Sequence, residues 1–127
     1  MKRKQRDLAE GILFTDQYQL TMAQLYFRAG IHEQRAQFDH FFRSYPDYGK
    51  HQAGYCVNAG LGTLLNWMRR AHFRDEDLAY LKAQKTRAGR PLFGDDFLTW
   101  LKRYGGFDAI TMRAVPEGHV VHPYAPL

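Results

Sequence analysis

Residues 95–106, DDFLTWLKRYGG, predict a helix that presents one apolar face to a core. Four side chains in this stretch repeat at intervals of three and four residues, as the buried stripe of a helix requires: Phe97, Trp100, Leu101 and Tyr104. The helix is expected to run from about Asp95 to Arg103 or Tyr104, because Gly105-Gly106 supplies a stop.

The two stretches before it also predict helices. Residues 75–77 are three acids, which suit the positive end of a helix dipole, and they precede Leu78 and Leu81 on the same expected helix. Residues 85–94, KTRAGRPLFG, form a basic loop between this helix and the one at 95–104. Further upstream, four apolar residues stand at i, i+3, i+4 and i+7: Leu61, Leu64, Leu65 and Met68.

An earlier helix is expected from about Asp16 to Ala29. The Thr15 hydroxyl is a suitable N-cap, because it can accept a hydrogen bond from an unpaired amide of the first turn, and Asp16 suits the helix dipole. Gly30 stands where a left-handed residue would end the helix. The stripe predicted to face the core consists of Tyr18, Met22, Leu25, Tyr26 and Ala29.

Four short strands complete the expected fold. Alternation of side chains predicts a strand over 36–43, and residues 54–58 form a second strand that pairs with it antiparallel across a turn-rich loop. Strands over 109–115 and 119–122 flank a type I turn at Pro116-Glu117-Gly118. The order of helix, two strands, three helices and two strands, without βαβ alternation, predicts an α+β fold with a small, mainly antiparallel sheet.

Composition assigns the chain to one globular domain with a basic tail. The net charge is +5, but residues 1–6 carry four of the basic groups and leave 14 basic against 13 acidic groups behind them. We expect a flexible tail over 1–11, a domain over 12–127, and no nucleic-acid partner. A single cysteine, no apolar stretch of membrane-spanning length and no secretory signal predict a cytoplasmic protein without a membrane partner.

Most motifs that carry chemistry are missing. His119 and His122 point to opposite faces of an expected strand, so they cannot coordinate one metal ion together. Cys56 has no adjacent base that would activate it as a nucleophile. The glycines at 60 and 62 are interpreted as a tight strand-to-helix turn, because the third glycine of a dinucleotide motif is absent. Most aromatic rings are expected in the core. We therefore predict no metal site and no catalytic residue in this chain.

Two places remain as binding candidates. Asp16 and Tyr18 lie at an expected helix start, where free amides favour anions. Arg43, at an expected strand end, can donate two parallel hydrogen bonds to a phosphate. The structural alternative is a capped helix whose Tyr18 joins the core, together with a surface arginine.

Several motifs in order resemble the opening of nicotinate phosphoribosyltransferases. The run ILFTDQYQLTMAQLYFRAG is similar to that family's T-D-x-Y-x-L-T-M-A segment, and VPEGHVVHPYAPL to its V-P-E-G-x-V-x-F-P-x-x-P-L segment. Between them FDHFFR, NAGLGTLLNWM, DEDLAYL and FLTWL follow in register. The family threonine that caps the DED helix is replaced by Arg74, and residues 82–92 depart from the usual pattern.

The resemblance implies the N-terminal α/β domain of a longer type II phosphoribosyltransferase, without its catalytic barrel. Members join nicotinic acid to the ribose phosphate of phosphoribosyl pyrophosphate with coupled ATP hydrolysis and Mg²⁺, in NAD salvage, a reaction classed with glycosyltransferases and ligases. Their active sites form at a dimer interface, which implies a homodimer or pairing with a barrel-containing chain.

By position, Tyr18 matches the family tyrosine that stacks on the pyridine ring, Asp16 matches the acid beside it, and Arg43 resembles the arginine that holds a phosphate. The phosphorylated histidine of the family has no counterpart among the six histidines here. The apolar end PYAPL agrees with a chain that continues or docks on a partner. We expect this chain alone to be inactive; the alternative is a stand-alone binding module that kept the fold.

Overall fold

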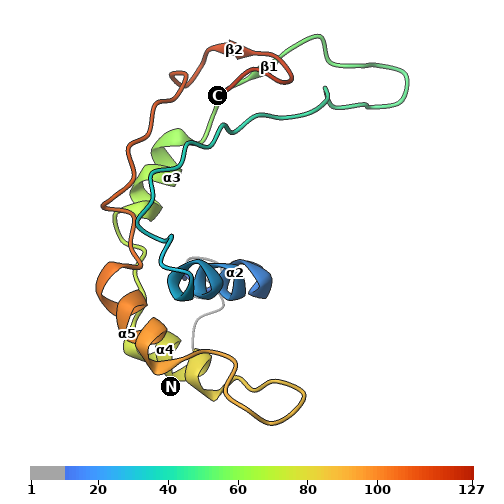
Figure 1. Cartoon of the computed structure of the whole chain (residues 1–127). Coiled ribbons are helices and arrows are strands. Elements are labelled where there is room, and N and C mark those ends of the chain that lie inside the picture. Colours follow the sequence, from blue (N-terminus) through green and yellow to red (C-terminus); the bar gives the residue numbers. More distant parts are fainter. Residues whose placement is uncertain (1–10) are drawn as a thin grey trace, which may run out of the picture. The chain divides into compact units, whose positions relative to one another are not determined.

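The computed structural model describes residues 11–127 as two compact units. The first contains the described residues up to Gln34 together with Trp67–Ala109, and the second contains Arg35–Asn66 together with Ile110–Leu127. The predicted tail over 1–11 lies outside the described residues except for Gly11. The elements in chain order are α2 (Gln17–Arg28), β1 (Cys56–Val57), α3 (Leu61–Met68), α4 (Asp75–Ala83), α5 (Asp95–Tyr104) and β2 (Val120–Val121) (Figure 1). In the described part this confirms the α+β class.

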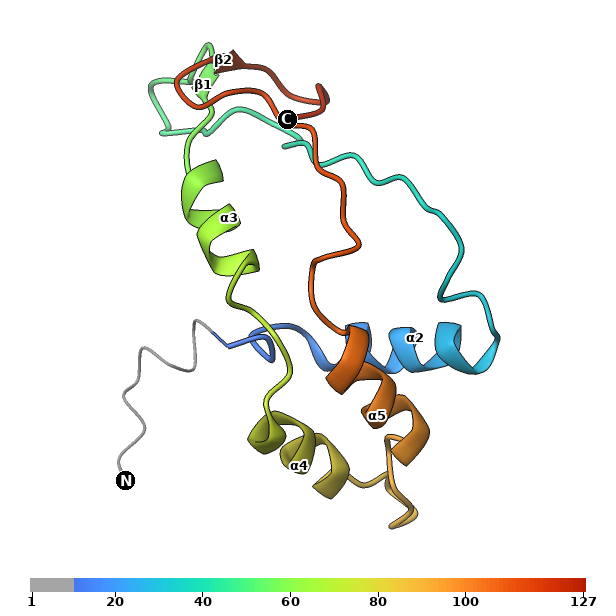
Figure 2. The same cartoon turned by 90° about the vertical axis from the view of Figure 1, so that its left-hand side faces the viewer.

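In the first unit α4 and α5 lie side by side as an antiparallel helix pair (Figure 2). Lys82 near the end of α4 pairs with Asp95 at the start of α5 at 2.9 Å, and Lys102 near the end of α5 pairs with Asp75 at the start of α4 at 2.5 Å. All four side chains are largely exposed, so each pair contributes little to stability. The two pairs link the start of each helix to the end of the other, as an antiparallel arrangement requires.

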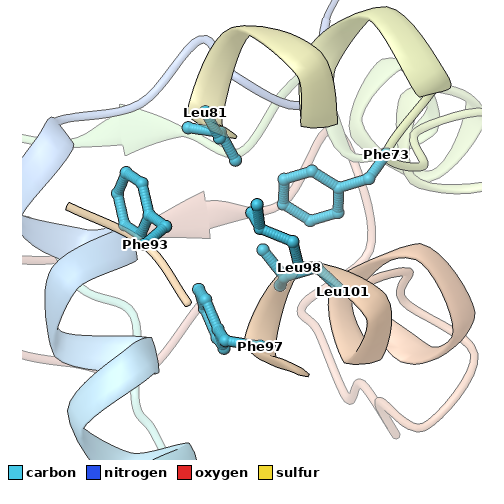
Figure 3. Packing of buried hydrophobic residues seen from close by; sticks show 6 residues of the cluster. All are labelled: Phe73, Leu81, Phe93, Phe97, Leu98 and Leu101. Atoms are coloured by element: carbon cyan, nitrogen blue, oxygen red, sulfur yellow. The ribbon is translucent and has the colours of Figure 1, made fainter. Parts of the chain in front are cut away.

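The core of the first unit lies between these helices and the segments that flank them. Figure 3 shows its six buried members, among which Phe97 is fully buried. The cluster consists of Phe73, Leu81, Phe93, Phe97, Leu98 and Leu101. On α5 the structure confirms Phe97 and Leu101 as core residues, whereas the predicted Tyr104 is 58% exposed and Leu98 is buried in addition.

Helix α2 packs on this core with a different face from the predicted one. Leu20, Ala23 and Phe27 contact the cluster. The predicted stripe was wrong, because its bulky members remain exposed: Tyr18, Met22, Leu25 and Tyr26. Both faces of α2 have apolar side chains at helical spacing, so periodicity alone does not select one. The inward face also carries Gln24, which is buried because it bonds two backbone groups near α5.

The ends of α2 follow local rules. Its C-terminus is a Schellman motif: Gly30 has φ 69°, its N–H donates to the Phe27 carbonyl, and the Ile31 N–H donates to the Tyr26 carbonyl. Gly30 is therefore confirmed as the left-handed terminator. The predicted N-cap Thr15 was wrong by one position, since Asp16 takes the extended N-cap conformation and makes no side-chain capping bond.

The second unit contains one small sheet rather than the predicted pairing. Strand β1 pairs antiparallel with β2, with Cys56 opposite Val121 and Val57 opposite Val120. The predicted strand over 36–43 does not form. Its backbone accepts only two bonds from the C-terminal segment, at the carbonyls of His40 and Phe42. That segment contains two prolines, Pro123 and Pro126, which lack the N–H groups a ladder needs.

Two smaller predictions in the second unit also fail. Residues 109–115 form no strand, and the turn that follows is not type I. The His119 N–H donates to the Pro116 carbonyl and Gly118 has φ 84°, which places glycine third in the turn, as type II requires. Aromatic rings were also predicted in the core too often, since more than half stay exposed and Phe38 is 90% exposed.

Candidate functional site

Asp16 and Tyr18 lie together at the start of α2 in the first unit. Asp16 is exposed at the N-cap position, and Tyr18 follows in the first helical turn. The Tyr18 side chain is 56% exposed, and its hydroxyl oxygen accepts a hydrogen bond from the Gln19 side-chain amide at 2.8 Å. The alternative that Tyr18 belongs to the core was therefore wrong. A flat aromatic face remains available to a planar ligand.

Tyr18 is part of a wider exposed apolar surface on α2, which we call the α2 outer face. Phe14, just before the helix, is 74% exposed, and Leu25 is 62% exposed. By helical spacing, Tyr18 and Leu25 lie on the opposite side of α2 from Leu20, Ala23 and Phe27, which contact the core. Several exposed apolar side chains on one short segment are typical of places where a protein meets a partner or a ligand. The face consists of Phe14, Tyr18, Met22, Leu25 and Tyr26.

Arg43 lies in the second unit, in a segment that belongs to neither of the two strands. It is exposed, and within residues 11–127 its guanidinium forms neither an ion pair nor a hydrogen bond. A guanidinium in this state has all its N–H donors free to bind a phosphate. The structure thus brings Asp16 and Tyr18 together, and it places Arg43 in the other unit.

The glycines at 60 and 62 form the start of α3, as the sequence predicts. Gly60 has φ 99°, and the strand-to-helix turn from β1 to α3 depends on that conformation. The N–H groups of Gly60 and Gly62 both donate to one oxygen of the Glu117 carboxylate, at 2.8 and 3.1 Å. The helix N-terminus, which could attract a phosphate, is therefore already occupied by an anion of the chain itself.

The other sequence candidates were the possible metal ligands and Cys56. In the described part of the chain no three or more His, Cys, Asp or Glu side chains gather as a metal site would need. Cys56 is a free, half-buried thiol on β1. None of the helices in residues 11–127 has the length and apolar character to cross a bilayer.

Sequence reasoning missed one polar pair in the second unit. The Tyr45 hydroxyl lies 2.6 Å from Nδ1 of His122, although the two residues are 77 positions apart. His122 drew attention only as a possible metal ligand beside His119. No local signal pairs a tyrosine in a turn-rich loop with a histidine at the end of a strand.

Comparison with known proteins assigns this arrangement to a family. Residues 13–127 match the family described as the nicotinate phosphoribosyltransferase (NAPRTase) N-terminal domain. The chain belongs to this family. The match covers both units and includes Asp16, Tyr18 and Arg43.

Named relatives agree with the family assignment. The chain is similar to the nicotinate phosphoribosyltransferase of Caenorhabditis elegans, with 36% identity over 91% of this chain and 19% of that protein. It is 44% identical to the Bacillus subtilis (strain 168) enzyme over 55% of this chain and 14% of that protein. The Mycobacterium tuberculosis (strain CDC 1551 / Oshkosh) enzyme is 36% identical over 91% of the chain and 22% of its own length. The chain thus spans a fifth or less of the first two relatives.

Proposed function

We propose that this chain is the N-terminal part of an enzyme that joins nicotinic acid to the phosphoribosyl group of phosphoribosyl pyrophosphate. The products are nicotinate mononucleotide and pyrophosphate, with ATP hydrolysis coupled to the step. Membership of the NAPRTase N-terminal domain family supports this reaction. The 56% exposure of Tyr18 links the proposal to a particular residue, because a ring buried in the core could not stack on a substrate.

Each candidate side chain has a role in this proposal. The Tyr18 ring stacks on the pyridine, Asp16 lies beside the same ligand, and the free Arg43 guanidinium binds a phosphate of the phosphoribosyl group. An aromatic face suits a flat heterocycle, and a planar fork of N–H donors suits a phosphate dianion.

We further propose that the chain acts only together with a catalytic barrel, in a homodimer or with a separate barrel-containing chain in the cytoplasm. The α2 outer face supports this role, because five exposed apolar side chains on one short segment favour a covering partner. On this view the isolated chain binds neither substrate tightly and does not turn over.

The test mixes this chain with the Bacillus subtilis relative truncated to remove the segment that this chain matches. We expect no turnover from either part and phosphoribosyl transfer from the mixture. Tyr18→Ala should then raise the KM for nicotinic acid roughly tenfold, in keeping with stacking energies of about 1–3 kcal/mol. Tyr48→Ala is the matched control, because Tyr48 is an exposed tyrosine outside the proposed site.

Arg43→Ala should raise the KM for phosphoribosyl pyrophosphate by roughly tenfold or more, because it removes charge-assisted hydrogen bonds worth about 1.5–3 kcal/mol. Arg35→Ala removes another exposed arginine from the same unit and should leave both constants unchanged. Turnover by the 127 residues alone would contradict the need for a barrel.

A stand-alone interaction module is the second candidate, because the α2 outer face would serve a protein partner equally well. A mixture that never turns over, while the chain still binds a partner through this face, would favour the module.

A further inference from the structure

The residues on both sides of Arg43 contact the C-terminal segment of the second unit, one through its backbone and the other through its side chain. On one side, the Phe42 carbonyl accepts a hydrogen bond from the Tyr124 N–H at 3.0 Å. On the other side, the Tyr45 hydroxyl lies 2.6 Å from Nδ1 of His122. Arg43 stands between these two anchors and has no polar partner within the described residues.

The Tyr45–His122 contact is directional. The two rings meet edge-on, at an interplanar angle of 88° with centroids 6.2 Å apart, so the hydroxyl points at the edge of the imidazole. When the imidazole carries its hydrogen on Nε2, Nδ1 accepts the Tyr45 O–H. Tyr45 is half-buried and also contacts the Phe42 ring at 6.1 Å. The bond therefore holds the Tyr45 ring, two residues after Arg43, in one orientation.

The other anchor depends on an unusual backbone conformation. Tyr124 has φ 62°, and it is the one residue other than glycine with positive φ in residues 11–127. This region is unfavourable for a residue with a Cβ atom and persists where the surroundings hold it. Here Tyr124 follows Pro123 as the third residue of a turn, which the Ala125 N–H closes by donating to the His122 carbonyl at 3.4 Å. The bond to Phe42 and a contact with the Phe41 ring, with centroids 5.8 Å apart, join this turn to the segment that carries Arg43.

We infer that Tyr45, His122 and Tyr124 are positioning residues that order the segment carrying Arg43 before its phosphate ligand arrives. The inference rests on the proposed function of Arg43. An arginine side chain loses much conformational freedom on binding, and a segment already held by a backbone bond before Arg43 and a side-chain bond after it leaves less to lose. The anchors lie in residues 42–45 and 122–124, and in this proposal they act on the segment that carries Arg43.

The experiment has two arms that fail independently. In the first, ¹⁵N relaxation of the 127-residue chain reports the backbone order parameter at Arg43 in Tyr45→Phe, which deletes only the hydroxyl. We expect a fall from about 0.85 towards 0.6. His122→Phe, which keeps a ring but removes the acceptor, should act in the same way. The exposed Tyr48 supplies the control Tyr48→Phe, which should leave Arg43 unchanged. An unchanged order parameter in both variants would overturn the inference.

The second arm is a double-mutant cycle in the mixture with the truncated relative. Tyr45→Phe should raise the KM for phosphoribosyl pyrophosphate roughly three- to tenfold with little change in kcat, which is the size of one lost hydrogen bond. In the Arg43→Ala background the same substitution should have no further effect, because its action passes through Arg43. An equal effect in both backgrounds would overturn the positioning role. If Arg43→Ala itself changes nothing while the relaxation result holds, the phosphate role of Arg43 fails and the ordering of its segment stands.

Discussion

The side chain of Gln24 joins α2 to the loop before α5 through the carbonyl of Leu92, to which its Nε2 donates at 3.0 Å. Its Oε1 accepts a second bond from the Gly94 N–H at 2.7 Å. Gln24 is only 6% exposed, so one buried amide satisfies two backbone groups that would otherwise lie unpaired beside the core. This contact selects the inward face of α2 and turns the α2 outer face away from the core.

Gln24→Ala should therefore destabilise the first unit by about 1–3 kcal/mol, the range for a buried group left without its partner. Both tryptophans, Trp67 and Trp100, lie in this unit, so urea unfolding followed by tryptophan fluorescence reports its stability. Gln17→Ala changes an exposed glutamine on the same helix and should shift the midpoint little. Equal midpoints for the two variants would contradict the role of Gln24.

Gly105→Ala should destabilise the same unit by about 1–3 kcal/mol, because the site is overpacked rather than conformationally restricted. Gly105 has φ −77°, which alanine adopts readily, but an added Cβ would lie 2.5 Å from the Leu101 carbonyl oxygen and 2.5 Å from the buried Phe73 ring. Gly106→Ala is the control, because its Cβ would meet nothing closer than 4.0 Å. Thermal unfolding monitored by tryptophan fluorescence would show the difference, and matching Tm values would refute the close packing.

Tyr18→Ala should leave the stability of the first unit within about 0.5 kcal/mol, as expected for an exposed side chain. Phe97→Ala, on the fully buried ring, should lose about 3–5 kcal/mol in the same measurement. A comparable loss for the two variants would mean that Tyr18 supports the fold, and a binding defect in Tyr18→Ala would then have a structural cause.

Glu117→Ala should expose the amides of Gly60 and Gly62 to faster hydrogen exchange, since both donate to the Glu117 carboxylate. Glu117→Gln keeps an acceptor oxygen but removes the charge that suits the α3 N-terminus. It should therefore lower the protection of these two amides against exchange by only about 0.3–1 kcal/mol. Glu33→Gln, an exposed acid in the other unit, serves as the control. Protection unaffected by Glu117→Ala would show that the turn is stable without the carboxylate.

The helices could be predicted from the sequence because their signals are local. Acidic residues begin α4, Gly30 ends α2 in a left-handed conformation, and Gly105 follows α5 at the predicted position. Each of these signals acts within one or two turns, where the backbone's own hydrogen bonds set the structure. The exposed Tyr18 and Arg43 could be named through resemblance to a family, whose match spans 13–127.

The strands show where local information ends. Alternation over 36–43 states which side chains share a face, but a strand also needs a neighbour with consecutive N–H groups. The neighbouring segment contains Pro123, Pro126 and the left-handed Tyr124, and it bonds this stretch at only two carbonyls. Strand β1 instead pairs with β2, more than 60 residues along the chain.

By itself the sequence determined the α+β class, the four helices of the described part and the family to which the chain belongs. Only the tertiary structure decided which face of α2 is buried, and so left Tyr18 exposed rather than in the core. It also brought the Tyr45 hydroxyl to His122 beside Arg43. The physical reason is the same in both cases. Helical periodicity depends on neighbouring residues in the sequence, whereas burial and side-chain hydrogen bonds depend on groups that only packing brings together.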